Sequence, residues 1–148
     1  MSYSNSKYII VFLIVCLLVN TFVDSVAIPQ ELEERSDIFA KLCGGFKFVS
    51  PKAGTKIKNG NTIEFKWTKN KDVELYRVLD VELYTQKGLV QVLWSKGVNF
   101  TGTSCSAKVK VSVPSGTKLP ATFLFKCWGS TKSGPQCTSV SGNFTITK

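Results

Sequence analysis

The chain has 148 residues, of which 43% are hydrophobic, and a formal net charge of +9 at pH 7. It contains no histidine, which excludes histidine-based catalytic triads, histidine-ligated zinc and histidine general bases. Its positive charge comes from 17 lysines and 2 arginines. Because specific nucleic-acid readers depend on arginine forks, this balance predicts that nucleic acid is not a partner.

An apolar run lies near the start of the chain. Residues 9–19 are eleven apolar residues in a row, preceded by Lys7 and followed by a small-x-small cleavage pattern at residues 25–27. Eleven helical residues at about 1.5 Å each cannot cross a hydrocarbon core about 30 Å thick, which argues against a transmembrane helix. The pattern predicts a secretory signal peptide over residues 1–27. No hydrophobic tail ends the sequence, so we expect no lipid anchor, no membrane span and a secreted, extracellular or wall-associated protein.

An acidic segment follows over residues 28–42. It carries Glu31, Glu33, Glu34 and Asp37, and its apolar residues recur at rough helical spacing. We expect an acidic N-terminal arm, which is a short helix, a pro-segment or a frayed end.

Beyond this arm, apolar residues alternate with polar or charged ones, as in strands with one buried face. Turns rich in glycine and proline separate the alternating segments. Seven segments show the pattern: residues 45–49, 62–67, 78–84, 89–94, 106–113, 121–128 and 138–147. Each apolar face must be buried against another sheet. The pattern therefore predicts one all-β domain over residues 43–148, a β-sandwich of about seven strands.

Side chains of these segments are assigned to a buried or an outward face by their position in the alternation. Trp67 and Trp94 share a face with their apolar neighbours, and so do Val92 and Val140. We expect all four in the core.

Four cysteines follow the predicted signal peptide: Cys43, Cys105, Cys127 and Cys137. An even number in an oxidising compartment predicts two disulfides, and the spacing contains no C-x-x-C pair that would favour a metal. Cys127 and Cys137 flank a short loop between two strands that a sandwich would place side by side. This favours a Cys127–Cys137 bridge and leaves Cys43 with Cys105.

The sequence also resembles a known family. The segments FVSPKAGT (48–55), NGNTIEFKW (59–67), VKVSVP (109–114) and SGNFTI (141–146) occur in this order. Together they are similar to the fungal cell-wall-synthesis KNH-like domain, the N-terminal immunoglobulin-like domain of Ser/Thr-rich GPI-anchored fungal surface proteins. The resemblance covers most of residues 45–148 and implies an immunoglobulin/fibronectin-III-like sandwich that acts at the fungal wall. Because a Ser/Thr-rich stalk and an anchor tail are missing, we expect a free secreted relative.

Asp80 and Glu82 are the best candidates for an acid/base pair. They are two residues apart on one strand face, and glycoside hydrolysis uses two carboxyl groups about 5–9 Å apart. The alternative is that both are exposed charges among neighbouring lysines, without the burial that marks catalytic carboxylates. We favour the alternative, so we expect a non-enzymatic protein without catalytic residues, metal or cofactor.

Trp128 and Tyr84 are the aromatic candidates for a binding site. Trp128 lies on the face opposite Phe125, next to a loop, and Tyr84 also points outward in the alternation. Exposed rings beside polar groups hold sugars, because the apolar face of the sugar stacks on the ring. The alternative is that Trp128 covers a sheet edge or contacts a partner.

Three outward lysines, Lys108, Lys110 and Lys126, complete the predicted ligand-binding set. They attract anionic polysaccharide, wall phosphate or lipid head groups if they act in binding. Otherwise they are a solvated surface that keeps strand edges from pairing.

Asn99 and Asn143 each begin an N-glycosylation sequon, Asn-Phe-Thr, and are the predicted sites of glycosylation. Taken together, the residues predict a secreted β-sandwich module that binds wall polysaccharide. The alternative is a secreted effector or interaction protein that binds a foreign protein or an anionic surface through its basic face. The ligand and the oligomeric state stay open at this level.

Overall fold

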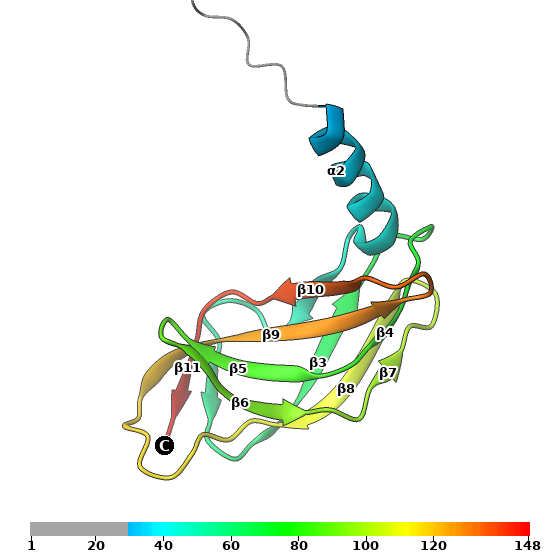
Figure 1. The fold of residues 1–148 in the computed structure, drawn as a ribbon. Coiled ribbons are helices and arrows are strands. Elements are labelled where there is room, and N and C mark those ends of the chain that lie inside the picture. Colours follow the sequence, from blue (N-terminus) through cyan, green and yellow to red (C-terminus); the bar gives the residue numbers. More distant parts are fainter. Residues whose placement is uncertain (1–29) are drawn as a thin grey trace, which may run out of the picture. The chain divides into compact units, whose positions relative to one another are not determined.

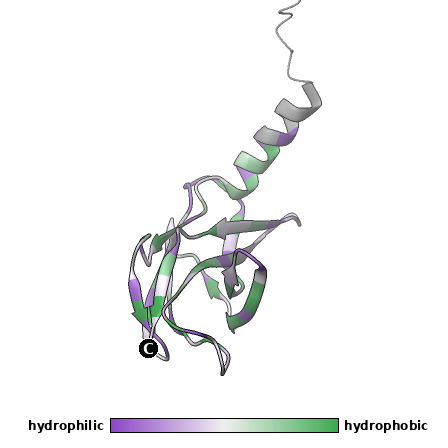
Figure 2. Cartoon of the chain, turned by 90° about the vertical axis from the view of Figure 1, so that its left-hand side faces the viewer, coloured by the Kyte–Doolittle hydropathy of each residue, from purple (hydrophilic) through white to green (hydrophobic). Residues whose placement is uncertain are grey.

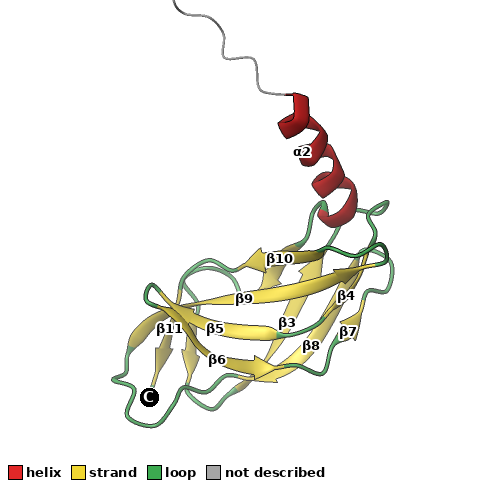
Figure 3. Cartoon of the chain, in the orientation of Figure 1, coloured by secondary structure: helices red, strands yellow, loops and turns green. Residues whose placement is uncertain are grey.

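The computed structural model describes residues 30–148, so the predicted signal peptide lies outside the described residues. Helix α2, Gln30–Cys43, begins within the segment predicted as an acidic arm and ends one residue beyond it (Figures 1 and 3). The strands are β1 (Lys47–Ser50), β2 (Lys56–Lys58), β3 (Thr62–Thr68), β4 (Leu75–Val78), β5 (Val81–Thr85), β6 (Gly88–Trp94), β7 (Val98–Asn99), β8 (Ser104–Lys110), β9 (Ala121–Thr131), β10 (Gln136–Val140) and β11 (Phe144–Thr147).

The strands form two sheets. The smaller sheet has the order β1-β3-β8, and the larger has the order β2-β11-β9-β4-β7. Strands β10 and β5 also pair with β9, and β6 pairs with β5. The all-β sandwich predicted from the alternation is confirmed. The number of strands is higher than predicted, because two predicted strands are each broken into two and the short strands β2 and β7 are added.

The core lies between the sheets because the alternation in each strand sends apolar side chains to one face. Apolar and hydrophilic residues are interspersed along the strands in Figure 2. Phe65 of β3 and Phe125 of β9 meet edge to face with ring centroids 4.7 Å apart, which joins the two sheets. Phe125 also stacks on Phe144 of β11 at 4.0 Å. Trp67 is fully buried, as predicted, and Trp94 is partly buried against it.

Strand β9 is the longest strand and pairs with different partners along its length. Its first half pairs with β5 on one side and with β11, whereas its second half pairs with β4 and β10. Strands β4 and β5 pair with one edge of β9, and β10 and β11 pair with the other. In each case the register shifts by one residue between the two strands. At these shifts residues 78–84 and 138–147, each predicted as one strand, are interrupted and form two strands each.

Irregularities in the strand pairing move two valines out of the predicted core. Val140 ends β10 opposite Lys126 and is 55% exposed, while Cys137 and Ser139 of the same strand are buried. Val92 is 51% exposed, because the register between β5 and β6 shifts and places Val92 opposite Glu82. One extra residue in a strand reverses the faces of the residues beyond it. The prediction that Val92 and Val140 are inward was therefore wrong.

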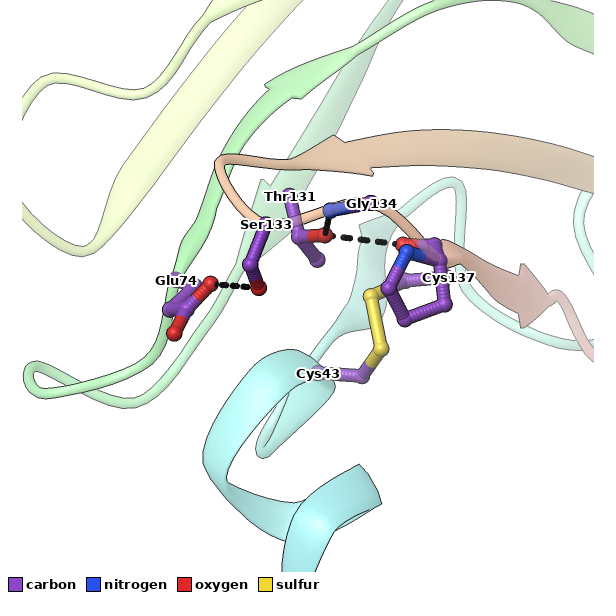
Figure 4. The surroundings of a disulfide bond; sticks show 7 residues. Cys43, Glu74, Thr131, Ser133, Gly134 and Cys137 are labelled. Carbon is purple, nitrogen blue, oxygen red and sulfur yellow. Dashed lines mark hydrogen bonds between the residues drawn. A yellow bond between two sulfur atoms is a disulfide. The ribbon is translucent and has the colours of Figure 1, made fainter.

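The disulfide joins Cys43, the last residue of α2, to Cys137 of β10, with Cα atoms 5.6 Å apart (Figure 4). Cys105 and Cys127 are free. The predicted pairs Cys127–Cys137 and Cys43–Cys105 were thus wrong. Cys127 points into the core, and its backbone partner on β10 is Ser139 rather than Cys137, which instead lies opposite Gly129.

The loop beside the disulfide is held by its own side chains. Thr131 Oγ1 donates a hydrogen bond to Pro135 O at 2.9 Å and accepts one from Gly134 N at 3.2 Å (Figure 4). Ser133 Oγ donates to Glu74 Oε2. These bonds fix the start of β10, which positions Cys137 at the end of the helix.

The two free thiols lead to a testable expectation. Burial raises the pKa of the Cys105 thiol to about 12, and burial also raises the pKa of the Cys127 thiol. Only about one Cys105 thiol in 10⁴ is then a thiolate at pH 8, and the thiolate is the reactive form. We expect a thiol reagent to modify the folded protein slowly, to modify Cys105 and Cys127 after unfolding, and to modify Cys43 and Cys137 only after reduction. Peptide mapping that finds Cys127 joined to Cys137 would contradict the observed pairing.

Candidate functional site

The outer face of β5 and β9 carries the predicted aromatic residues, and the break between β4 and β5 positions them. Leu79 N–H, within the break, donates to Trp128 O at 2.8 Å. Trp128 N–H in turn donates to Asp80 Oδ1 at 3.2 Å. The Asp80 side chain therefore takes the place of a strand partner at this point of β9, which holds the backbone of Trp128.

Glu82 holds the two rings. Its Oε2 accepts a hydrogen bond from Trp128 Nε1 at 3.1 Å and another from the Tyr84 hydroxyl, also at 3.1 Å. Glu82 and Tyr84 come from β5 and Trp128 from β9, and period two directs all three away from the core. One carboxylate oxygen thus fixes the polar ends of both rings.

Lys126 lies over both rings. It is the cross-strand partner of Glu82, and its Nζ is 4.2 Å from the centroid of the Trp128 ring and 5.8 Å from that of Tyr84. An ammonium group within about 6 Å of a ring is attracted to its face. We call Glu82, Tyr84, Lys126 and Trp128 the ring cluster; all four side chains are half-buried.

The electrostatics of the ring cluster follow from its partial burial. Burial raises the pKa of Asp80, and the hydrogen bond from Trp128 N–H opposes this rise. Burial also raises the pKa of Tyr84, and its hydrogen bond to Glu82 adds to the effect, because the phenol then donates to a negative group. Asp80 and Glu82, considered above as an acid/base pair, both accept hydrogen bonds from Trp128 in this structure. Asp80 holds the backbone of Trp128, and Glu82 holds its ring.

The structure divides the predicted ligand-binding residues between two faces. Tyr84, Lys126 and Trp128 come together in the ring cluster. Lys108 and Lys110 lie on the exposed face of β8 in the smaller sheet, where they pair with Glu64 and Thr62 of β3. They therefore belong to another surface than the ring cluster.

The sequence did not predict that Glu82 accepts hydrogen bonds from both rings. The sequence places it on the outward face, but its position opposite Lys126 depends on the register between β5 and β9. A signal was present in the alternation, since Glu82 and Tyr84 share one face of one strand. The alternation does not show which strand pairs with β5, so it could not identify Trp128 and Lys126 as neighbours of Glu82.

Asn99 and Asn143 are both exposed, Asn99 at the end of β7 and Asn143 directly before β11. The phenylalanine that follows each of them packs toward the core. The geometry thus presents both sequons to solvent, and their glycosylation stays a prediction.

Within residues 30–148, no three histidine, cysteine, aspartate or glutamate side chains are grouped so as to hold a metal ion. The described part of the chain also contains no helix with the length and apolar character needed to cross a membrane.

No family model matches the chain, and no curated protein matches it either. Among solved structures, the chain is similar to the fibronectin(III)-like modules of CbhA from Clostridium thermocellum. The two are 14% identical, with a TM-score of 0.42 over 69% of this chain and 94% of that one.

Proposed function

We propose that the chain is a secreted, non-enzymatic β-sandwich module of the KNH-like type that acts at the fungal cell wall or outer surface and binds wall polysaccharide through the ring cluster. The observation that carries the proposal is the pair of rings of Tyr84 and Trp128, both hydrogen-bonded to one carboxylate oxygen on the outer face of the sheet. Rigid aromatic side chains with polar neighbours are suited to sugars, because they offer apolar contact and hydrogen bonds together.

Lys126 decides how a sugar would approach. Because its ammonium group lies over the Trp128 ring at 4.2 Å, a sugar ring that stacks there has to displace it or take hydrogen bonds from it. If a sugar displaces Lys126 from the ring, its ammonium group can still donate hydrogen bonds to hydroxyl or acidic groups of the same polysaccharide. The ring cluster therefore combines a stacking surface with one cation.

The test is retention of the purified chain on insoluble β-glucan and on chitin, measured as the fraction depleted from solution. We expect Trp128→Ala to weaken retention about tenfold, because the stacking surface is removed. Trp128→Phe keeps a ring without the indole N–H and should retain most of the binding. Phe39→Ala removes an apolar side chain that is 58% exposed on α2, outside the ring cluster, and should bind as the wild type does.

The variants need a folding control, because Trp128 is half-buried. Loss of one hydrogen bond and of the contact with Lys126 should cost about 1–2 kcal/mol of stability, which leaves the domain folded. Undiminished retention of a folded Trp128→Ala variant would contradict the proposed site. Binding to protein or lipid targets with none to either polysaccharide would instead favour the effector interpretation.

A further inference from the structure

A second surface, distant in sequence from the ring cluster, has the form of a groove. It runs along β2 and the neighbouring parts of β1 and β3, with a volume of about 660 Å³. This volume lies within the range of about 300–1,000 Å³ that ligand sites occupy. Four lysines line it, Lys52, Lys56, Lys58 and Lys66, and we call it the basic groove.

The lysines of the basic groove are directed outward by the strand pattern. In β2, buried Ile57 stands between exposed Lys56 and Lys58, so the two lysines project from the same side. Lys52 is exposed in the turn that precedes β2. Exposed Val49 and half-buried Ile63 give the groove an apolar floor.

The charge of the basic groove is not balanced within the protein. Its single lining carboxylate, Glu64, is paired with Lys66 at 3.0 Å, and the hydrogen bond from Lys66 lowers the pKa of Glu64. Among the described residues, Lys52, Lys56 and Lys58 form no ion pair. Three cations therefore face a groove whose only carboxylate is already neutralised.

We infer that the basic groove is a binding site for an anionic polysaccharide chain, whose charges are carboxylates or phosphate esters. The charge complementarity comes from the three unpaired lysines, which attract anions by long-range electrostatics. The groove favours a chain over a membrane, because a bilayer presents a plane of head groups whereas an extended sugar chain can lie along a trough. The apolar floor suits the C–H faces of sugar rings between the charges. The site shares no residue with the ring cluster, so either proposal can fail while the other stands.

The test compares two variants that lose the same charge. In the first, Lys52, Lys56 and Lys58 become glutamine; in the second, three exposed lysines outside the groove do so, namely Lys87, Lys96 and Lys132. Binding is measured against polygalacturonate for carboxylates, phosphomannan for phosphates, neutral β-glucan and vesicles containing phosphatidylserine, at low and at physiological salt.

We expect the groove variant to bind at least one of the two anionic polymers about tenfold more weakly, with a reduced dependence on salt, because screening acts over about 8–10 Å. The matched variant should change the affinity by less than about threefold. Retention on neutral β-glucan should be the same in the groove variant as in the wild type, since that retention tests the ring cluster. An equal loss in both variants would show diffuse attraction to net charge and overturn the site. Groove-dependent binding to vesicles without binding to either anionic polymer would overturn the assignment to polysaccharide.

Discussion

Replacement of Trp67 by alanine should lower the free energy of unfolding by about 3–5 kcal/mol. The side chain is fully buried, and its ring lies 5.7 Å from that of Phe48, 5.9 Å from Phe65 and 6.4 Å from Trp94. Truncation leaves a cavity among three aromatic rings that cannot close it without moving both sheets. Urea denaturation followed by circular dichroism measures the loss.

Two substitutions calibrate this result. Trp67→Phe keeps an aromatic ring and removes an indole N–H that has no hydrogen-bond partner within the described residues, so its loss should be smaller. Leu89→Ala, at an exposed position, should stay within about 0.5 kcal/mol of the wild type. A Trp67→Ala variant as stable as Leu89→Ala would show that the assignment of buried and outward faces in β3 is wrong.

Removal of the disulfide by Cys43→Ala together with Cys137→Ala should lower the free energy of unfolding by about 2–5 kcal/mol. The bridge joins residues 94 apart in sequence, so it restricts a large part of the unfolded chain. The end of α2 also loses its covalent link to β10. The same denaturation measurement checks this prediction.

Cys105→Ala is the matched control, because Cys105 is unbridged and half-buried. It removes one sulfur without removing a cross-link, so its effect on stability should be clearly smaller. Equal losses in the single and double variants would mean that the cross-link contributes nothing beyond the packing of its sulfur atoms.

The faces of single strands were predictable from the sequence, because period two depends only on neighbouring residues. Trp67 and Phe65 face the core, and Trp128 faces away from it, as the alternation indicates. The same rule failed at Val92 and Val140, where an irregularity changes the phase. The strand breaks within residues 78–84 and 138–147 are one-residue shifts in the pairing with β9. Such shifts depend on the assembled sheet rather than on the residues of either segment.

The aromatic residues of the candidate site could be predicted from the sequence, whereas their hydrogen-bond partners could not. Trp128 and Glu82 are 46 residues apart, and their hydrogen bond depends on the register between β5 and β9. The disulfide shows the same limit: loop length favoured Cys127 as the partner of Cys137, whereas the end of α2 brings Cys43 there. The basic groove likewise requires three segments to meet, although the alternation around Ile57 already places two lysines on one side.

The indole N–H resonances offer the most direct test of sugar binding by the ring cluster. The chain has three tryptophans, so three indole signals report on Trp67 in the core, Trp94 beside it and Trp128 in the ring cluster. The purified chain would be titrated with soluble β-glucan and chitin oligosaccharides and followed by heteronuclear NMR. We expect the Trp128 signal to move saturably with one of these sugars, while the Trp67 signal stays in place. Absence of any Trp128 shift with both sugars, or saturable shifts confined to other surfaces, would contradict the account.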